Sequence, residues 1–491
     1  MKYHLVTLGC QMNKSDSERV RTVIEQMGYA WTDQEDQADM LGILSCSVRQ
    51  KAIDKVYSRI HKWNHWKKNK NLISFVTGCV LPSDKEKFLK LFDLVFTMDD
   101  LPELESIIRQ YGIVTPLGIA AKQEKPELNL PDNKLALEPG SETLELTSLA
   151  EHQEKIQAYE PGQLKPVKYI ELGSFWKVNP TYTSGFEAFV PIQNGCDKFC
   201  TFCAVPYTRG REVSRPSGEI LEEIKNLIDQ EYRSITLLGQ NVNSYGLEKK
   251  GDEISFSDLL DKIGMVGDAS GKKVWIYFTS PHPKDMTEEV IRVIGKYKCL
   301  AKQIHLPIQS GDEKVLIKMN RNHSVAKYRD IIHAIQKHIP QSTIFTDIIV
   351  GFTGETEKQF ENTRKVMEEF KYNMAYIAMY SPRPGAVSSR WVDDIPVEMK
   401  KERLHILSEE LKKHSRVHNE QLTGKMITVL VTGFDRKPGF LSGYTEGRII
   451  VRFKSGQEEL IGKFVVVEID SAADFSVEGK LADVKEPEKI R

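Results

Sequence analysis

The sequence has no long apolar run, no marked excess of charge and few cysteines. None of its hydrophobic stretches approaches the roughly 20 residues that a membrane-spanning helix needs, and the start MKYHLVTLGC lacks the layout of a signal peptide. These absences lead us to expect a cytoplasmic protein. The net charge of −1 does not point to a nucleic-acid partner, so a nucleic acid would have to be held by local basic patches.

Cysteine is scarce, with seven in 491 residues, and the count is odd. An odd count in a large chain expected in the cytoplasm argues against a disulfide framework and favours metal binding or catalysis. Cys299 stands apart and is expected to be a structural thiol. The other six fall into two groups of three, namely Cys10, Cys46 and Cys79, and Cys196, Cys200 and Cys203.

The chain is too long for one hydrophobic core, and 40% apolar with 28% charged residues is an ordinary globular composition. Changes in pattern predict an α/β protein with three folded parts. We expect an open parallel α/β sheet domain over 1–115, a partial (β/α) barrel over 184–422 and a small β-barrel over 423–491. The polar stretch 116–183, rich in proline and glycine, is predicted to be a linker or insertion.

The first domain alternates strand-like runs with amphipathic stretches, of which 15–28 is predicted to be a helix. The strand-like runs are 4–9, 40–45 and 71–78. Cys10, Cys46 and Cys79 each directly follow one of these runs. Because ligands bind at the carboxyl ends of parallel strands, the three thiols are expected to converge. Each cysteine alone is better explained as a small buried residue, but the repeated placement favours a metal site.

The second part, 184–422, repeats the alternation of strand and helix. The expected strands are 186–192, 234–239, 273–278, 302–306, 345–351 and 374–380. Six such units in a row predict a barrel or partial barrel with its active site at the carboxyl ends of the strands. A charged helix is expected over 397–422, and the short β-type runs after 424 indicate the small barrel.

The loop after the first barrel strand carries GCDKFCTFC, a C-x3-C-x2-C array formed by Cys196, Cys200 and Cys203. Closed zinc sites and closed iron–sulfur cubes both take four ligands, and this loop offers three. Zinc arrays usually come as two cysteine pairs, and no second pair lies nearby. The spacing therefore favours a [4Fe–4S] cluster with one open iron over a structural zinc knuckle, and the first triad invites the same interpretation.

Longer motifs surround both triads. They are GCQMNKSDSE (9–18), CSVRQKA (46–52), GCDKFCTFCAVPYTRGREVSRP (195–216), LLGQNVNSYG (237–246), TSPHPKDMTEE (279–289), HLPIQSGDEKVLIKMNR (305–321), DIIVGFTGET (347–356) and SPRPGA (381–386). Together they resemble the radical S-adenosylmethionine methylthiotransferases, most closely the MiaB-type branch that modifies tRNA. QMN after Cys10 and SVR after Cys46 favour this branch over those acting on a ribosomal protein or on threonylcarbamoyl-adenosine. The tail resembles a TRAM domain, a small RNA-binding barrel.

This resemblance implies that a methylthio group is added to C2 of N6-isopentenyl-adenosine next to the anticodon. It also implies two [4Fe–4S] clusters. The cluster at Cys196, Cys200 and Cys203 binds S-adenosylmethionine and generates the radical, and the cluster of the first triad holds the sulfur. The expected partners are the tRNA anticodon loop, an external electron donor of flavodoxin or ferredoxin type and a sulfur donor, without a membrane. Leu44, Ser45 and Thr353 depart from the family pattern, as does the length of 116–183.

Weaker candidates lie at the ends of the barrel strands. By the same resemblance, Gly239 and Gln240 are expected to contact the methionyl amine of S-adenosylmethionine, and Ser280 its ribose. Gln309, beyond the fourth strand, is a further candidate for cofactor binding. Turn formation and capping explain these residues about as well.

Basic residues suggest where RNA would be held. The run 49–70 contains eight Lys/Arg and one Asp, with Trp63 and Trp66 between them. It fits either phosphate and base contacts or a solvated helix face with buried tryptophans. Further candidate contacts to tRNA or substrate are Arg209, Arg211 and Arg383. Two other functions stay open: a methylthiotransferase acting on a different modified adenosine or a protein side chain, and a non-enzymatic metal-binding RNA module.

Overall fold

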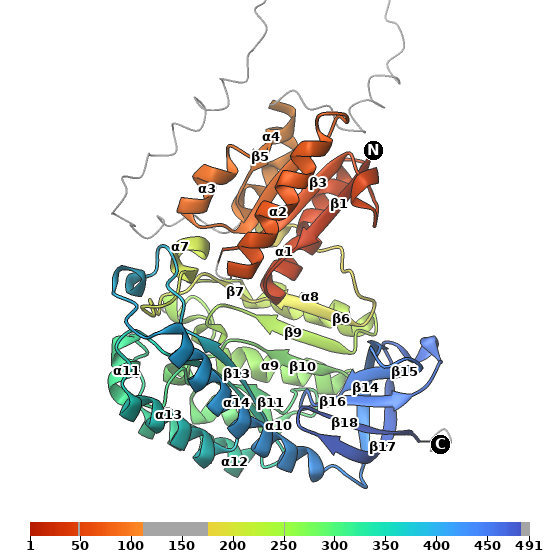
Figure 1. Ribbon diagram of the computed structural model, residues 1–491. Coiled ribbons are helices and arrows are strands. Elements are labelled where there is room, and N and C mark those ends of the chain that lie inside the picture. Colours follow the sequence, from red (N-terminus) through yellow and green to blue (C-terminus); the bar gives the residue numbers. More distant parts are fainter. Residues whose placement is uncertain (48–49, 111–174, 250, 483–491) are drawn as a thin grey trace, which may run out of the picture.

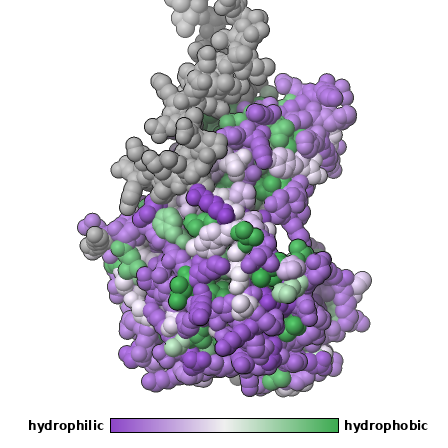
Figure 2. Space-filling view, turned by 60° about the vertical axis from the view of Figure 1, so that its left-hand side comes forward, coloured by the Kyte–Doolittle hydropathy of each residue, from purple (hydrophilic) through white to green (hydrophobic). Residues whose placement is uncertain are grey.

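The computed structural model describes residues 1–47, 50–110, 175–249 and 251–482. Along the chain it contains an N-terminal parallel sheet, a partial barrel of parallel strands and a closed C-terminal β-barrel (Figure 1). The predicted fold class is thereby confirmed. Within these residues, no helix has the length and apolar character needed to cross a membrane. Figure 2 shows one face of the molecule, on which hydrophilic residues predominate and apolar side chains gather in the middle.

The N-terminal sheet has the order β2-β1-β3-β4-β5, and all its pairs are parallel. Its strands are β1 (Lys2–Thr7), β2 (Ala30–Trp31), β3 (Met40–Cys46), β4 (Ile73–Cys79) and β5 (Leu94–Val95). Its helices are α1 (Gln11–Gln26), α2 (Gln50–Trp66), α3 (Pro82–Phe88) and α4 (Leu104–Gln110). Val20 of α1 and Val56 of α2 belong to two separate apolar clusters. The central strand β3 is buried over its whole length, as expected for a parallel sheet with both faces covered.

The predicted linker 116–183 lies outside the described residues up to position 174. Its described end packs on the N-terminal domain, where Phe175 and Trp176 are buried in the cluster that includes Val20. The hydroxyl of Thr183 donates a hydrogen bond of 2.8 Å to the Glu18 carboxylate on α1. This part of the chain is therefore tied to α1.

The partial barrel consists of two three-stranded parallel sheets, β10-β9-β6 and β11-β12-β13. A parallel bridge between Ile276 and Leu300 connects their neighbouring edges. The strands are β6 (Glu187–Pro191), β9 (Ser234–Leu238), β10 (Trp275–Phe278), β11 (Gln303–His305), β12 (Thr343–Val350) and β13 (Met374–Met379). All six expected strands are present, and one large apolar core packs the helices against them.

The helices of this domain are α7 (Val205–Arg209), α8 (Ser217–Asp229), α9 (Phe256–Ala269), α10 (Glu288–Lys296), α11 (Glu313–Lys318), α12 (Val325–His338), α13 (Glu357–Phe370) and α14 (Val397–Glu420). The short strands β7 (Gln193–Asn194) and β8 (Val213–Ser214) form a small hairpin ladder around the cysteine loop. Helix α14 contacts β13 and α13 and reaches the C-terminal barrel (Figure 1). It therefore joins the last two domains.

The C-terminal barrel closes in the order β14-β15-β16-β18-β17. Its strands are β14 (Met426–Phe434), β15 (Phe440–Tyr444), β16 (Ile450–Lys454), β17 (Phe464–Ala473) and β18 (Ser476–Leu481). This barrel docks on the amino ends of strands of the partial barrel. Tyr444 donates to the first residue of β9, Ser234, at 3.0 Å, and Thr343, the first residue of β12, donates to the Gly447 carbonyl at 2.8 Å.

Candidate active site between the N-terminal domain and the barrel

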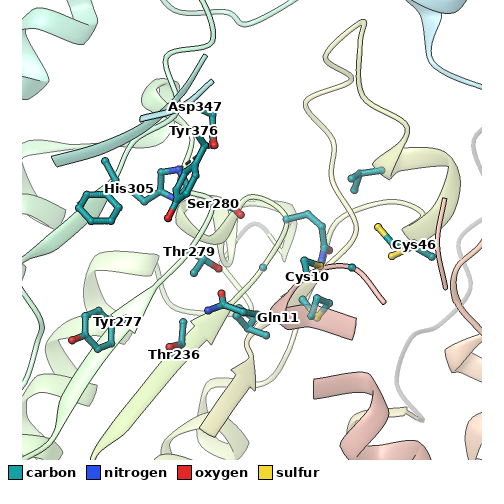
Figure 3. Close-up of a pocket in the computed structure, with 18 of the residues that line it drawn as sticks. Cys10, Gln11, Cys46, Thr236, Tyr277, Thr279, Ser280, His305, Asp347 and Tyr376 are labelled. Carbon is teal, nitrogen blue, oxygen red and sulfur yellow. Dashed lines mark ion pairs between the residues drawn. The ribbon is translucent and has the colours of Figure 1, made fainter. Parts of the chain in front are cut away.

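A cavity of about 850 Å³ runs through the inside of the partial barrel to the N-terminal domain. Barrel strands contribute every second residue to its wall, as the two-residue period of a strand requires. These residues are Thr236 and Leu238, Tyr277 and Thr279, Gln303 and His305, Phe345 and Asp347, and Tyr376. Figure 3 shows Cys10 and Cys46 on one side of the cavity and His305, Asp347 and Tyr376 on the other. The cavity therefore faces both domains.

The first cysteine triad lines this cavity. Cys46 and Cys79 end the neighbouring strands β3 and β4 and are register partners, and Cys10 immediately precedes α1. Gly9 lets the loop before Cys10 approach closely, because a Cβ atom at Gly9 would lie 2.7 Å from the Cys46 Cβ. Gly9 also has a φ of +112°, which L-residues avoid. The structure thus brings together the three thiols that the strand ends predict.

The second triad lies in the loop after β6. Cys203 also lines the cavity, whereas Cys196 and Cys200 are buried and do not belong to its wall. The amide of Cys203 donates to the Cys200 carbonyl at 2.9 Å, and a guanidinium nitrogen of Arg321 lies 3.5 Å from the Cys200 sulfur. The loop is therefore folded back on itself, with one thiol facing the other triad.

The donor sets of both triads fit iron–sulfur clusters. Soft thiol ligands in groups of three, without histidine or carboxylate partners, favour a cluster over a hard cation. Burial raises the pKa of both Cys79 and Cys203 to about 12, so the positive charge of bound metal is needed to hold them as thiolates. In the described ranges, no three Cys, His, Asp or Glu side chains are placed to share one metal ion. The thiolates of a cube bind separate irons, so this spacing suits a cube better than zinc.

Arg209 was expected to contact tRNA or substrate, but the structure buries it at the first triad. It ends helix α7, and its Nε donates to the Cys79 sulfur at 2.9 Å. Its Nη2 donates to Asn13 at 2.9 Å and to Asp16 at 2.5 Å. Asn13 in turn donates to the carbonyls of Leu8 and Ser45, both at 2.6 Å, and so fastens the ends of β1 and β3. Asn13 and Asp16 are site residues that sequence reasoning missed.

Helix α1 carries the contact between the two domains. Ser15 donates to the Phe189 carbonyl on β6 at 3.1 Å, and the Lys14 ammonium lies 4.8 Å from the Phe189 ring centroid. The side chain of Met12 packs with Phe189 and Leu238 of the barrel. The same helix that follows Cys10 is therefore fixed against the domain that holds Cys203.

The predicted S-adenosylmethionine residues are only partly brought together. Gly239, Gln240 and Ser280 line the cavity, and a Cβ atom at Gly239 would meet Gln193 Oε1 at 3.0 Å. Within the described part of the chain, the amide oxygens of Gln193 and Gln240 are buried without a hydrogen-bond partner. Gln309 does not belong to the cavity wall. Its amide donates to the Asp347 carbonyl and its carbonyl accepts from the Ile349 amide of β12, and its φ is +73°.

The far end of the cavity contains a residue from the C-terminal barrel. The Arg448 guanidinium lies 4.0 Å from the Tyr277 ring centroid and 4.1 Å from that of Tyr444. Nearer the middle, His305 Nε2 lies 2.9 Å from an Asp347 carboxylate oxygen (Figure 3). No short-range pattern in the sequence points to Arg448, because its place depends on docking of the whole domain.

The remaining residues singled out from the sequence are the candidate RNA contacts and Cys299. Trp63 is completely buried and Trp66 is partly buried, which fits the helix-face interpretation of α2. Arg383 donates to Gln50 at 3.4 Å, and Arg211 pairs with an aspartate at 2.9 Å. Cys299 is buried, with its thiol 3.5 Å from a helix carbonyl, in keeping with a structural thiol.

Comparison with family models defines the class of protein. Residues 190–367 match the radical SAM superfamily, 2–98 match the uncharacterized protein family UPF0004, and 420–482 match the TRAM domain. Among solved structures, the fold is similar to the radical S-adenosylmethionine methyltransferase TsrM from Kitasatospora setae, with a TM-score of 0.50 and 12% identity. That similarity covers 93% of this chain and 81% of the other. The chain is thus a radical SAM protein with an extra domain at each end.

Curated relatives define the family within that class. Proteins named tRNA-2-methylthio-N(6)-dimethylallyladenosine synthase match over nearly the whole length. The one from Saccharophagus degradans is 34% identical over 98% of this chain and 96% of its own. The one from Chromohalobacter salexigens is 35% identical over 98% of both chains, and that from Shigella boydii serotype 4 is 34% identical over 100% and 94%. The chain belongs to the tRNA-2-methylthio-N(6)-dimethylallyladenosine synthase family.

Proposed function

We propose that this protein is a radical S-adenosylmethionine methylthiotransferase that adds a methylthio group to C2 of N6-isopentenyl-adenosine beside the anticodon of tRNA. Its family and its radical SAM domain support the assignment. The observation that carries it is the meeting of thiols from two domains at one cavity. Cys10, Cys46 and Cys79 reach the cavity from the N-terminal sheet, and Cys203 reaches it from the barrel loop.

Two metal groups are assigned to these thiols. The ligands of the first [4Fe–4S] cluster, which also takes S-adenosylmethionine, are Cys196, Cys200 and Cys203. The ligands of a second, auxiliary [4Fe–4S] cluster are Cys10, Cys46 and Cys79. When bound, S-adenosylmethionine would supply the methyl group, and the clusters would hold the sulfur and supply the one-electron chemistry that an unactivated C2–H bond requires.

The residues of the chain then position and shield the reactants. Gly239, Gln240 and Ser280 hold S-adenosylmethionine, and the buried amide oxygen of Gln240 is free to accept a hydrogen bond from its amine. The target base has to leave the stack of the anticodon loop to enter the cavity. Tyr376 is 54% exposed, so its ring offers a face on which a base can stack, and the His305 ring lies beside it at 5.6 Å between centroids, tilted by 58°.

The domains divide the work between them. Residues 1–115 hold the auxiliary cluster, 184–422 hold S-adenosylmethionine, and 423–491 contribute to binding of the tRNA, as the TRAM match suggests. Electrons come from an external donor of flavodoxin or ferredoxin type, and the inserted sulfur comes from a separate donor. Neither alternative function is favoured by the names of the relatives.

Nucleoside mass spectrometry tests the proposal. Anaerobically reconstituted protein is incubated with S-adenosylmethionine, a reductant and tRNA that carries isopentenyl-adenosine, with tRNA lacking the isopentenyl group as a control. The expected product is the 2-methylthio nucleoside in the first tRNA only. If S-adenosylmethionine is cleaved and neither nucleoside changes, the substrate assignment is wrong and the radical site stands. A colourless, zinc-loaded protein that does not cleave S-adenosylmethionine would instead support the metal-binding RNA module.

A further inference from the structure

Arg209 lies between the two cysteine triads. Helix α7, the five residues Val205–Arg209, begins two residues after Cys203 and ends at Arg209. Arg209 then reaches across the domain boundary to Cys79 at the end of β4. One short helix therefore connects a ligand of the cluster that takes S-adenosylmethionine with a ligand of the auxiliary cluster.

The guanidinium of Arg209 is buried, and each of its three nitrogens has a polar partner. Besides the 2.9 Å bond from Nε to the Cys79 sulfur, Nη2 bonds to Asn13 and Asp16, and Nη1 lies 3.4 Å from the Asn194 side-chain oxygen. The side-chain amide of Asn194 also donates to the Arg209 carbonyl at 3.2 Å, which fixes the end of the helix.

The geometry differs from that of an arginine whose only task is an ion pair. Such a pair is usually bidentate, with two parallel N–H groups directed at one carboxylate. Here Asp16 accepts from Nη2 alone, and within the described chain its other oxygen is buried without a hydrogen-bond partner. The Nε–H is directed at the sulfur of Cys79 instead. The arrangement therefore serves the thiol as well as the carboxylate.

We propose that Arg209 is a positioning residue for the auxiliary cluster, which holds the Cys79 sulfur in place and raises the reduction potential of the cluster. The inference rests on the proposed assignment of that cluster to the first triad. Reduction potentials of iron–sulfur clusters depend on net charge and on hydrogen bonds to the sulfurs. A buried cation that donates to a ligand sulfur stabilises the reduced, more negative cluster. Asp16 offsets part of that charge, so it acts in the opposite direction.

The test uses the full chain with Cys196, Cys200 and Cys203 replaced by Ala, so that only the auxiliary cluster remains. Its reduction is followed by electron paramagnetic resonance in a redox titration, and its iron content is measured. Arg209→Met should lower the ratio of reduced to oxidised cluster at least tenfold at a fixed potential, which is about 59 mV for one electron. Asp16→Asn should raise the ratio, since Arg209 then acts without its counter-ion.

Arg403→Met is the matched control. Arg403 is buried and pairs with the buried Glu355 at 2.9 Å, and its hydrogen bonds within the described residues go to Glu355 and Glu357, not to a cysteine. It should lower the melting temperature and leave the potential unchanged. If Arg209→Met and Asp16→Asn both keep the parent ratio within threefold, Arg209 is only an interdomain ion pair and the inference is wrong. If the Arg209→Met protein does not retain the cluster, the Asp16→Asn protein decides. A higher ratio of reduced to oxidised cluster than in the parent supports the inference, and a lower or equal ratio refutes it. A parent protein without iron would refute the auxiliary cluster itself.

Discussion

Comparison of Cys46→Ala with Cys299→Ala distinguishes a thiol that binds metal from a thiol that only packs in the core. The exposed fractions of Cys46 and Cys299 are 3% and 4%, so each Ala replacement removes one buried sulfur. The loss of one such atom costs about 1 kcal/mol of the free energy of unfolding. For Cys299 nothing more is expected, because its sulfur packs against α9 beside Gly267 and its thiol makes a weak 3.5 Å hydrogen bond to the Gly264 carbonyl.

For Cys46 the expected loss is chemical. Cys46→Ala should retain about four of about eight irons per chain, since each cube holds four. It should still cleave S-adenosylmethionine and should yield no methylthiolated nucleoside, whereas Cys299→Ala keeps full iron and full product. Iron analysis, cleavage of S-adenosylmethionine and nucleoside mass spectrometry are measured on the same preparations. If Cys46→Ala methylthiolates tRNA at the wild-type rate, the reasoning from converging strand ends is refuted.

Three further predictions follow from other parts of the structure. Cys196→Ala should abolish cleavage of S-adenosylmethionine and keep the auxiliary cluster; cleavage that persists would contradict the ligand assignment. Burial raises the pKa of Glu355 from 4.5 to about 7 although an arginine faces it. Its contribution to stability is therefore complete below pH 4.5 and is lost as pH rises through 7. In denaturant titrations, the free energy of unfolding of Glu355→Gln should rise relative to that of wild type by on the order of 3 kcal/mol between pH 5 and 8. A difference that does not change with pH would refute this. Gly447→Val should force the C-terminal barrel away from Thr343, whose methyl carbon lies 2.6 Å from the position of an added Cβ, at a cost of about 1–3 kcal/mol. Thermal melting and limited proteolysis should show the change, and Gly456→Val, with open space around it, should not.

Much of the fold is predictable from the sequence because buried parallel strands are continuous apolar runs. The prediction of a strand over 234–239 compares with Ser234–Leu238 for β9, and 345–351 compares with Thr343–Val350 for β12. The strands β15 and β18 are not among the β-type runs that the sequence predicts, since a serine–glycine pair interrupts one and a glutamate–glycine pair the other. Their strand state depends on pairing with distant neighbours in the closed barrel, which no local pattern records.

Prediction of the site reaches the cysteines and, among the weaker candidates, Gly239, Gln240 and Ser280, which line the same cavity. Convergence of Cys10, Cys46 and Cys79 follows from a general property of parallel sheets, so it can be expected without coordinates. Helix α1, in contrast, begins at Gln11 and not at 15, because its first turns bury polar residues such as Asn13. The burial of these polar side chains depends on partners outside the helix: Asn13 donates to the Leu8 and Ser45 carbonyls and accepts from Arg209 of the other domain. A single sequence contains no signal for such a contact.

The wall of the cavity contains residues from both ends of the chain, Cys10 in the first domain and Arg448 in the last. The ribosome makes the chain from its amino end, so Cys10 is present long before Arg448. Until the C-terminal barrel has folded onto the amino ends of the strands of the partial barrel, the cavity is open at that end. Its closure is therefore a late event for the nascent chain, and during synthesis the thiols are open to the surroundings from a side that the finished enzyme covers.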